Sequence, residues 1–145
     1  MRIVVQRSKK ASVTVEGKVV GEISNGLVLL VCLEKGDTEE TLLKSAEKIK
    51  NLRCFTCPET GKMNLNLEQA SGEILAVSQF TLSWRGQKGN RPSFDHSLAP
   101  EMANEMFERF VSELKRSFKV ETGVFGASME VALVNDGPVT FSLDF

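Results

Sequence analysis

Polar side chains gather at the end of one apolar segment, in the order Ser78, Gln79, Phe80 and Thr81. The apolar residues before them predict a strand over residues 73–82. Hydroxyl, amide and backbone N–H groups at the end of a strand can bind a carbonyl group or stabilise an oxyanion. A strand that simply runs out to the protein surface carries polar residues as well. The residue types alone leave both interpretations open.

A serine–histidine–acid triad is one way to activate these hydroxyl groups. His96 is the only histidine of the chain, so it would have to serve Ser78 or Thr81, with Asp95 as the acid. An aspartate next to the histidine in sequence is poorly placed to orient the imidazole ring, and the chain has no G-x-S-x-G motif. We therefore interpret His96 as a surface residue.

Two cysteines form a CxxC motif at Cys54 and Cys57. A zinc site would need two further ligands, and the remaining candidates, Cys32 and His96, lack the spacing of paired ligands. Redox-active CxxC motifs gain a lowered thiol pKa at the start of a helix, whereas this motif follows the end of a predicted helix. We interpret the motif as structural or incidental, and we expect neither a metal nor a cofactor.

Gly137 and Pro138 interrupt the apolar pattern near the end of the chain. Such a pair suits a hairpin turn, because proline presets its own φ angle and glycine tolerates a positive one. An X–Pro bond is also where a cis peptide can occur, and a cis bond exposes consecutive carbonyl groups on one side. The pair is therefore either a simple turn or a rigid polar loop.

The composition is that of one ordinary globular domain over residues 1–145. Hydrophobic residues make up 41%, charged residues 26%, and the formal net charge is −1. This balance excludes a protein that holds nucleic acid by bulk positive charge alone. Apolar runs are too short for a membrane span or a signal peptide, and three cysteines, an odd number, favour a reducing compartment. We expect a cytoplasmic protein without membrane contact.

Positive charge is nevertheless concentrated locally. Residues 74–94 contain Arg85, Lys88 and Arg91 and no acidic residue. A basic face that meets an anionic partner and a set of solvated surface loops explain this pattern equally well.

The order of predicted elements indicates a mixed α/β fold. Strands are predicted over residues 2–6, 11–15, 18–23, 27–33, 73–82, 119–122, 129–135 and 139–145. Helices are predicted over residues 38–52, with Asp37 and Glu40 at capping-box spacing, and over residues 100–117, which begin with Pro100. We expect mixed or antiparallel sheets packed as a sandwich or barrel-like core, with both helices on one face.

Two segments together resemble motifs of the D-aminoacyl-tRNA deacylase family. They are Ser78-Gln79-Phe80-Thr81-Leu82 and Asn135-Asp136-Gly137-Pro138-Val139-Thr140. Weaker matches accompany them in order at residues 6–7, 26–28, 62–64, 91–94 and 122–129. Cys32, where the family favours glycine, and Ser83-Trp84 depart from the family pattern.

The resemblance implies a homodimer that hydrolyses the ester between a D-amino acid and the terminal ribose of tRNA, and that also removes glycine from mischarged tRNA. It implies a cis Gly137–Pro138 bond that enters the partner subunit's active site. The carbonyl groups of this bond would leave no room for an L side chain. Arg7 matches a residue that holds this loop in place.

The resemblance also implies roles for the pocket residues. Ser78 and the Phe80 amide would hold the substrate near the scissile carbonyl, within a motif that includes Gln79 and Thr81. The 2′-hydroxyl of the terminal adenosine, not Thr81, would activate the water. Phe125 and Met129 match positions that line the pocket. The basic residues Arg85, Lys88 and Arg91 would meet the acceptor stem.

Two other functions stay open at this point. One is an esterase with Thr81 or Ser78 as its nucleophile, which a trapped acyl-enzyme would reveal. The other is a non-catalytic RNA-binding module, which would bind tRNA without turning over its aminoacyl ester.

Overall fold

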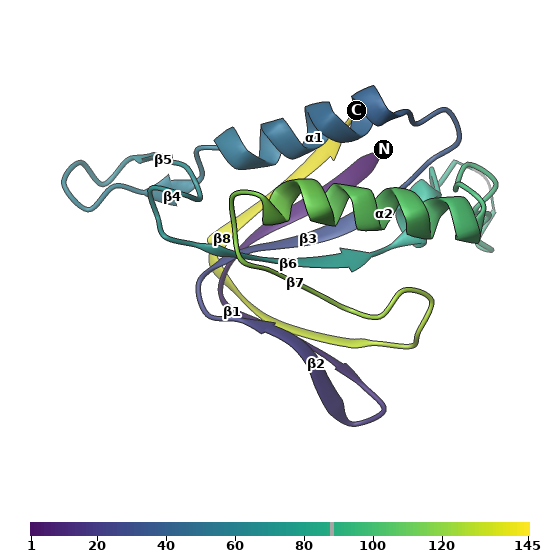
Figure 1. Cartoon of the computed structure of the whole chain (residues 1–145), viewed down its shortest axis with the longest axis horizontal. Helices are drawn as coiled ribbons and strands as arrows, with labels where there is room; N and C mark the ends of the chain where they lie inside the picture. The colour runs from purple at the N-terminus through teal and green to yellow at the C-terminus, as the bar shows by residue number, and fades with distance from the viewer. Residues whose placement is uncertain (88) are drawn as a thin grey trace.

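Two helices cover one face of a strongly curved sheet, as Figure 1 shows for the computed structural model, which describes residues 1–87 and 89–145. The strands are β1 (Arg2–Val15), β2 (Lys18–Ile23), β3 (Gly26–Cys32), β4 (Phe55–Thr56), β5 (Met63–Leu65), β6 (Glu73–Ser78), β7 (Val120–Thr122) and β8 (Glu130–Asp144). The helices are α1 (Glu39–Asn51), α2 (Pro100–Lys115) and the single 3₁₀ turn η1 (Phe80–Ser83). None of the described helices is long and apolar enough to cross a bilayer.

The main sheet is mixed and almost closes on itself. Its strands lie in the order β2-β1-β3-β6-β7, and β8 pairs with β1. Strand β1 is antiparallel to its neighbours, whereas β3, β6 and β7 are parallel. A Cβ atom at Gly21 of β2 would lie 2.6 Å from the backbone oxygen of Thr122 in β7, so the glycine permits the two outer strands to approach. The predicted mixed fold, with a barrel-like sheet and both helices on one face, is confirmed.

The apolar run of β3 supplies two cores. Leu27 and Leu29 join a cluster with the inner faces of α1 and α2, while Val28 joins a second cluster on the opposite face of the sheet. Because successive side chains of a strand point to opposite faces, a strand buried on both faces reads as continuously apolar. This explains why β3 carries no polar alternation.

Two pairs of predicted strands are each one continuous strand. Residues 2–6 and 11–15 both belong to β1, and the predicted strands 129–135 and 139–145 fall in β8 except for their outermost residues, 129 and 145. Both halves of β8 pair antiparallel with β1, so the chain cannot reverse direction at Gly137 and Pro138. Of the two interpretations that the sequence left open, the simple turn is therefore excluded, and the pair lies in a bulge.

Other boundaries shift for local reasons. Helix α1 is capped by Thr38, whose hydroxyl accepts a hydrogen bond from the Thr41 N–H at 3.3 Å, and not by Asp37. The Asp37 carboxylate is already engaged by the Met1 ammonium group and the Glu34 N–H. Helix α2 ends at Lys115, slightly before the predicted end.

Strand β6 stops at Ser78, earlier than the predicted end at residue 82. The Gln79 N–H bonds to the Val31 carbonyl at 2.7 Å, after which the chain turns into η1. The polar motif that begins at Ser78 is therefore a strand end followed by a tight turn.

Candidate active site

A cavity of about 530 Å³ opens where β3 and β6 end. This volume is in the range of small-molecule sites. Its walls come from the ends of these two strands, the start of η1, the segment leading into α2 and the loop between β7 and β8. The described lining residues are Val31, Leu33, Lys35, Ser78, Gln79, Phe80, Phe94, Ser97, Leu98, Ala99, Pro100, Ala103, Phe125 and Gly126.

Two hydrogen-bond donors in this cavity have no partner among the described residues. Within residues 1–87 and 89–145, no hydrogen bond involves the Ser78 hydroxyl, and none starts from the Phe80 N–H. The N–H groups at the start of a helical turn lack partners within that turn. Ser78 and Phe80 therefore offer a hydroxyl and an amide to a ligand in the cavity.

The hydroxyl of Thr81 is held by a neighbour that is not a base. Gln79 Nε2 donates to Thr81 Oγ1 at 2.6 Å, and Thr81 lies outside the cavity lining. A nucleophilic hydroxyl needs an acceptor for its proton. A side-chain amide that donates to the oxygen cannot accept this proton, so the Gln79 contact does not activate Thr81 as a nucleophile.

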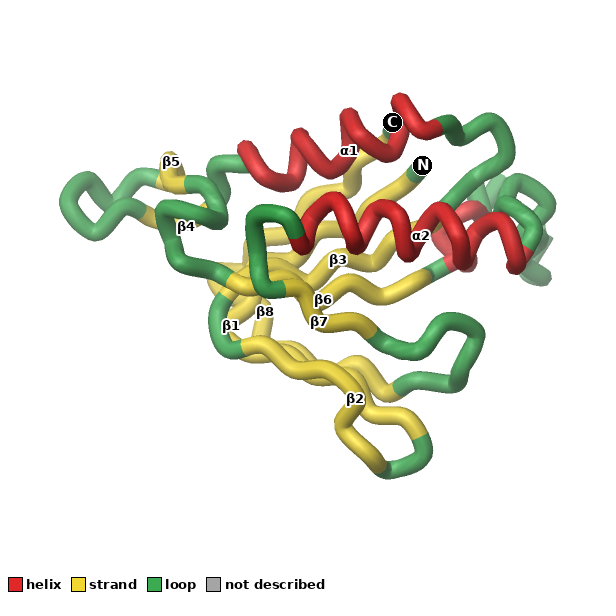
Figure 2. The backbone as a smooth tube through the Cα atoms, in the orientation of Figure 1, coloured by secondary structure: helices red, strands yellow, loops and turns green. Residues whose placement is uncertain are grey.

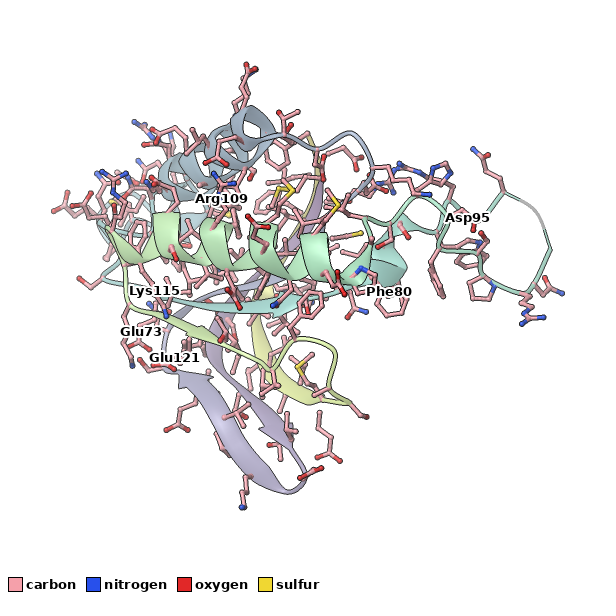
Figure 3. The ribbon with its side chains drawn as sticks, turned by 45° about the vertical axis from the view of Figure 1, so that its right-hand side comes forward. Glu73, Phe80, Asp95, Arg109, Lys115 and Glu121 are labelled. Carbon is pink, nitrogen blue, oxygen red and sulfur yellow. The ribbon has the colours of Figure 1, made fainter. Side chains whose placement is uncertain are left out.

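His96 does not complete a triad in the described structure. Asp95 accepts a hydrogen bond from the Ser93 hydroxyl, its near neighbour in the loop, and His96 is exposed outside the cavity lining. Figure 3 shows Asp95 on a loop that extends beyond the end of the molecule where Phe80 lies. Neither residue is positioned to take a proton from Ser78.

The CxxC cysteines follow α1 and lie in different environments. Burial raises the pKa of the Cys54 thiol to about 11, while a hydrogen bond with the Thr60 side chain lowers the pKa of Cys57. Burial likewise raises the pKa of Cys32 to about 11. Within the described residues, no group of three or more histidine, cysteine or acidic side chains is arranged to hold a metal ion.

These environments predict that one thiol per chain reacts rapidly. The thiolate is the reactive species, so a lowered pKa and partial exposure favour Cys57 near neutral pH. Titration with Ellman's reagent should give one fast equivalent in the native protein and three after unfolding. Cys57→Ser should remove the fast phase, and two fast equivalents in the native protein would contradict this structure.

Gly137 and Pro138 form an exposed bulge on β8. Gln6 and Ser8 of β1 pair with Thr140 and Asn135, so residues 136–139 all lie opposite Arg7 alone. The peptide bond between Gly137 and Pro138 is cis. Gly137 has φ +131°, and a Cβ atom there would lie 2.7 Å from a methyl carbon of Val139, so only glycine fits.

Arg7 ties this bulge to the rest of the molecule. Its buried guanidinium group donates through Nε to the Asp136 carbonyl at 3.0 Å and lies 3.2 Å from the Asp136 carboxylate. Nη1 donates to the Cys54 carbonyl at 2.6 Å. One side chain thus bridges the bulge and the segment that follows α1.

Asn135 closes the bulge from the other side. Its Nδ2 donates to Gln6 Oε1 at 3.0 Å and to Thr140 Oγ1 at 2.8 Å, and its Oδ1 accepts from the Val139 N–H at 2.8 Å. The amide therefore joins both ends of the bulge to each other and to β1.

The bulge lies far from the cavity of its own chain. Arg7 pairs with Leu27 near the start of β3, whereas Ser78 pairs with Val31 near its end. These positions are four residues apart, which is about 13 Å along a strand. The bulge also lies on the far side of β1. Arg7 contacts Cys54, the residue before β4. Figure 2 shows β4 at one end of the molecule and the loop after β6 at the other.

The other candidate residues are distributed around these features. Phe125 lines the cavity, with its ring centroid 6.4 Å from that of Phe107. Met129 is partly buried against the second core cluster and is not part of the cavity lining.

The basic residues Arg85 and Arg91 lie outside the cavity lining. Arg85 Nη2 pairs with both oxygens of Glu34 at 3.0 and 3.1 Å. Arg91 is exposed, and Lys88 lies outside the described residues.

The sequence matches the family model described as D-Tyr-tRNA(Tyr) deacylase over residues 4–144. The chain belongs to this family. A relative named D-aminoacyl-tRNA deacylase from Thermosipho africanus is 54% identical over 145 residues, which cover 99% of this chain and 97% of the relative. A relative of the same name from Kosmotoga olearia is 53% identical over 144 residues, with the same coverage.

Two solved structures share the fold of this chain. A protein titled c-Myc DNA Unwinding Element Binding Protein superimposes with a TM-score of 0.95 at 36% identity, covering 100% of this chain and 99% of the other. A probable eukaryotic D-amino acid tRNA deacylase gives a TM-score of 0.83 at 18% identity, covering 99% and 98%, and supports the fold alone.

Several residues of this deacylase-family site carry no signal in the sequence. Lys35 brings a cation to the cavity wall, although a single lysine after a strand is an ordinary surface residue. The Cys54 carbonyl that holds Arg7 is a backbone group, and sequence patterns do not reveal which carbonyl a side chain will reach. The Asn135 contacts depend on the bulge, which the pairing of β8 with β1 creates and the sequence does not show.

Proposed function

We propose that the chain hydrolyses the ester bond of D-aminoacyl-tRNA, and that it acts in the same way on mischarged glycyl-tRNA. The observation that carries this proposal is the pair of unpartnered donors, the Ser78 hydroxyl and the Phe80 N–H, in a largely apolar cavity. Full-length relatives at about half identity carry the name D-aminoacyl-tRNA deacylase, which supports the same substrate class.

The proposed reaction uses these donors on the ester carbonyl. A water oxygen adds to the ester carbon, and the charge that develops on the carbonyl oxygen is stabilised by Ser78 and Phe80. The bond to the ribose 3′-oxygen then breaks, and that oxygen takes up a proton. Since no base contacts Thr81 or Ser78 within the described residues, we assign activation of the water to the neighbouring 2′-hydroxyl of the RNA.

We propose that the protein is a homodimer and that the partner subunit selects for the D configuration of the substrate's amino acid. The Gly137–Pro138 bulge is exposed and lies far from its own cavity, so it can line only the cavity of another chain. Every residue of β8 is at least partly exposed, and Val134 is among the exposed large hydrophobic residues. A strand of this kind is suited to pack against a second copy.

The bulge would exclude L-amino acids by backbone contact. If the carbonyl groups of Gly137 and Pro138 face the substrate Cα, an L side chain collides with main chain, while a D side chain or the hydrogen of glycine does not. Exchanging a side chain cannot remove a backbone group. The filter should therefore depend mainly on what holds the bulge in position.

Arg7→Ala should raise the cleavage of L-aminoacyl-tRNA relative to D-aminoacyl-tRNA. The change removes the contacts to Asp136 and to the Cys54 carbonyl, so the bulge loses its anchor. Deacylation rates on D and L substrates with the same amino acid measure this ratio. Arg7→Lys keeps the charge but not the planar, forked donor geometry, and it should shift the ratio in the same direction. An unchanged D/L ratio in a folded, dimeric Arg7→Ala protein would contradict the assignment.

The tRNA acceptor stem is proposed to meet the basic segment with Arg85, Lys88 and Arg91. Replacing all three by glutamine should weaken binding of D-aminoacyl- and glycyl-tRNA alike, because phosphate contacts position the RNA without specifying the amino acid. The slope of log K against log salt should shrink by up to about 0.9 per lost contact. Arg85 should contribute less than Arg91, because Glu34 already pairs with it.

A charge-matched variant separates this effect from a change in net charge. Three exposed lysines on the helices serve as the control when replaced by glutamine, namely Lys44, Lys48 and Lys115. Their removal should leave the salt slope unchanged. If the slope of log K against log salt is the same for both triple variants, the basic segment does not contact the RNA.

Turnover tests the proposed function against its two rivals. Catalytic amounts of the protein should release many equivalents of amino acid from D-tyrosyl-tRNA and from glycyl-tRNA, and no acyl-enzyme should be detected by mass spectrometry. A trapped acyl group on Thr81 or Ser78 would favour the esterase with a protein nucleophile. Binding of tRNA without any release would favour the non-catalytic RNA-binding module.

A further inference from the structure

Trp84 is a large aromatic residue on the surface, at a position that departs from the family motif. It is the only tryptophan of the chain, it is 39% exposed, and it belongs to neither core cluster. The backbone N–H of Trp84 donates to the Thr81 carbonyl at 3.2 Å, which closes η1. The indole is therefore attached directly to the turn that carries the Phe80 amide.

Another aromatic residue, Phe80, lies at the start of the same turn. Phe80 is 56% exposed and meets Phe94 edge to face, with ring centroids 4.9 Å apart and planes at 80°. Both phenylalanines line the cavity. Figure 3 shows Phe80 at the end of the molecule where α2 begins. The turn η1 thus carries a cavity-lining aromatic residue at its start and Trp84 at its end.

The backbone after Trp84 is anchored. Arg85 is held by both carboxylate oxygens of Glu34, and that carboxylate is mostly buried at the end of β3. The segment from Ile74 to Phe94 contains no acidic residue, so nothing within it repels a phosphate. Trp84 is therefore an exposed aromatic ring on a fixed backbone within a segment free of negative charge.

We propose that Trp84 stacks on an unpaired base of the tRNA 3′ end, next to the terminal adenosine that carries the amino acid. The proposal rests on the proposed function, because it requires the aminoacyl ester in the cavity beside Phe80. Exposed aromatic rings beside a channel for single-stranded nucleic acid bind bases by stacking, with little preference for sequence. All tRNAs end in the same unpaired CCA, so one stacking residue serves every substrate.

The intrinsic fluorescence of Trp84 tests this proposal directly, because no other tryptophan contributes to the signal. The probe is an unacylated acceptor-stem minihelix with a single-stranded ACCA end. Stacking should quench the emission in a saturable way. A minihelix of the same duplex without the four unpaired nucleotides should leave the emission unchanged.

Substitutions test the energetic contribution by a second readout. Trp84→Ala should weaken binding of a fluorescein-labelled ACCA minihelix by about 5- to 150-fold, the range for loss of one stacked base, and lower kcat/KM by a similar factor. Trp84→Phe should retain most of the affinity. Leu43→Ala, at an exposed apolar residue of α1 that is 46% exposed, is the matched control and should change neither value.

The D/L ratio separates this proposal from the proposed function. Trp84→Ala should leave that ratio unchanged, since stacking holds the RNA and not the amino acid. Unchanged kcat/KM in Trp84→Ala, or unquenched emission while the labelled minihelix binds, would overturn the stacking role and leave the deacylase function standing. Absence of any deacylation by the unsubstituted protein would instead overturn both.

Discussion

A D-aminoacyl-tRNA that ends in 2′-deoxyadenosine should be hydrolysed at least about 10²-fold more slowly than the same substrate with a ribose end. Thr81→Ala, in contrast, should keep most of the activity on the ribose substrate. The reason is the geometry around Thr81, whose hydroxyl accepts a hydrogen bond from Gln79 and contacts no base in the described structure. Among the described residues, neither the Ser78 hydroxyl nor the Thr81 hydroxyl contacts a base that could take its proton.

Binding must be separated from chemistry in this comparison. The deoxy substrate should bind with nearly the same affinity as the ribose substrate, as measured by its inhibition of ribose-substrate hydrolysis. A Thr81→Ala protein that binds substrate normally but has no activity would support the protein nucleophile. Rapid hydrolysis of the deoxy substrate would exclude the RNA hydroxyl as the activating group.

Ser78→Ala should lower kcat by about 10²–10³-fold, which is the usual cost of removing one donor to a developing oxyanion. The Ser78 hydroxyl lies in the cavity wall at the end of β6 and makes no hydrogen bond to the described protein. The substitution removes few atoms at a half-buried position, so the fold should be retained. Single-turnover deacylation of D-tyrosyl-tRNA measures the change without interference from product release.

Ser97→Ala provides the matched control in the same cavity. Its hydroxyl already donates to the Leu98 carbonyl at 3.3 Å, so it is not available to a substrate oxygen. We expect its kcat to stay close to that of the unsubstituted protein. Equal losses for the two serine variants would show that cavity polarity in general, and not a donor at Ser78, supports catalysis.

The fold was largely predictable because its main signals are local. The continuous apolar run of β3 indicates a strand that is buried on both faces. The periodic apolar residues of α1 and α2 indicate helices that are buried on one face. The wrong predictions arose where a long-range contact decides the outcome. Thr38 replaces Asp37 as the cap because the distant Met1 ammonium group engages Asp37. The chain continues through Pro138 because β1 pairs with both halves of β8.

The sequence pointed to Ser78, Phe80 and Phe125 of the cavity wall but not to Lys35, and it did not show how these residues are arranged. The sequence placed Ser78 and Phe80 at a strand end, and the structure adds the cavity that surrounds them. Arg7 was expected to hold the Gly137–Pro138 loop, yet the backbone carbonyl of Cys54 that fixes Arg7 has no sequence pattern. The separation between the bulge and its own cavity depends on strand register, which only the paired sheet reveals.

The ratio of kcat/KM for D-tyrosyl-tRNA and L-tyrosyl-tRNA, on the same tRNA, tests the central claim most directly. Exclusion by the Gly137–Pro138 backbone predicts rapid release of D-tyrosine and at least about 10²-fold slower release of L-tyrosine, since a clash of about 3 kcal/mol in the transition state is sufficient for that factor. Comparable rates on the two substrates would contradict a chiral filter at this bulge.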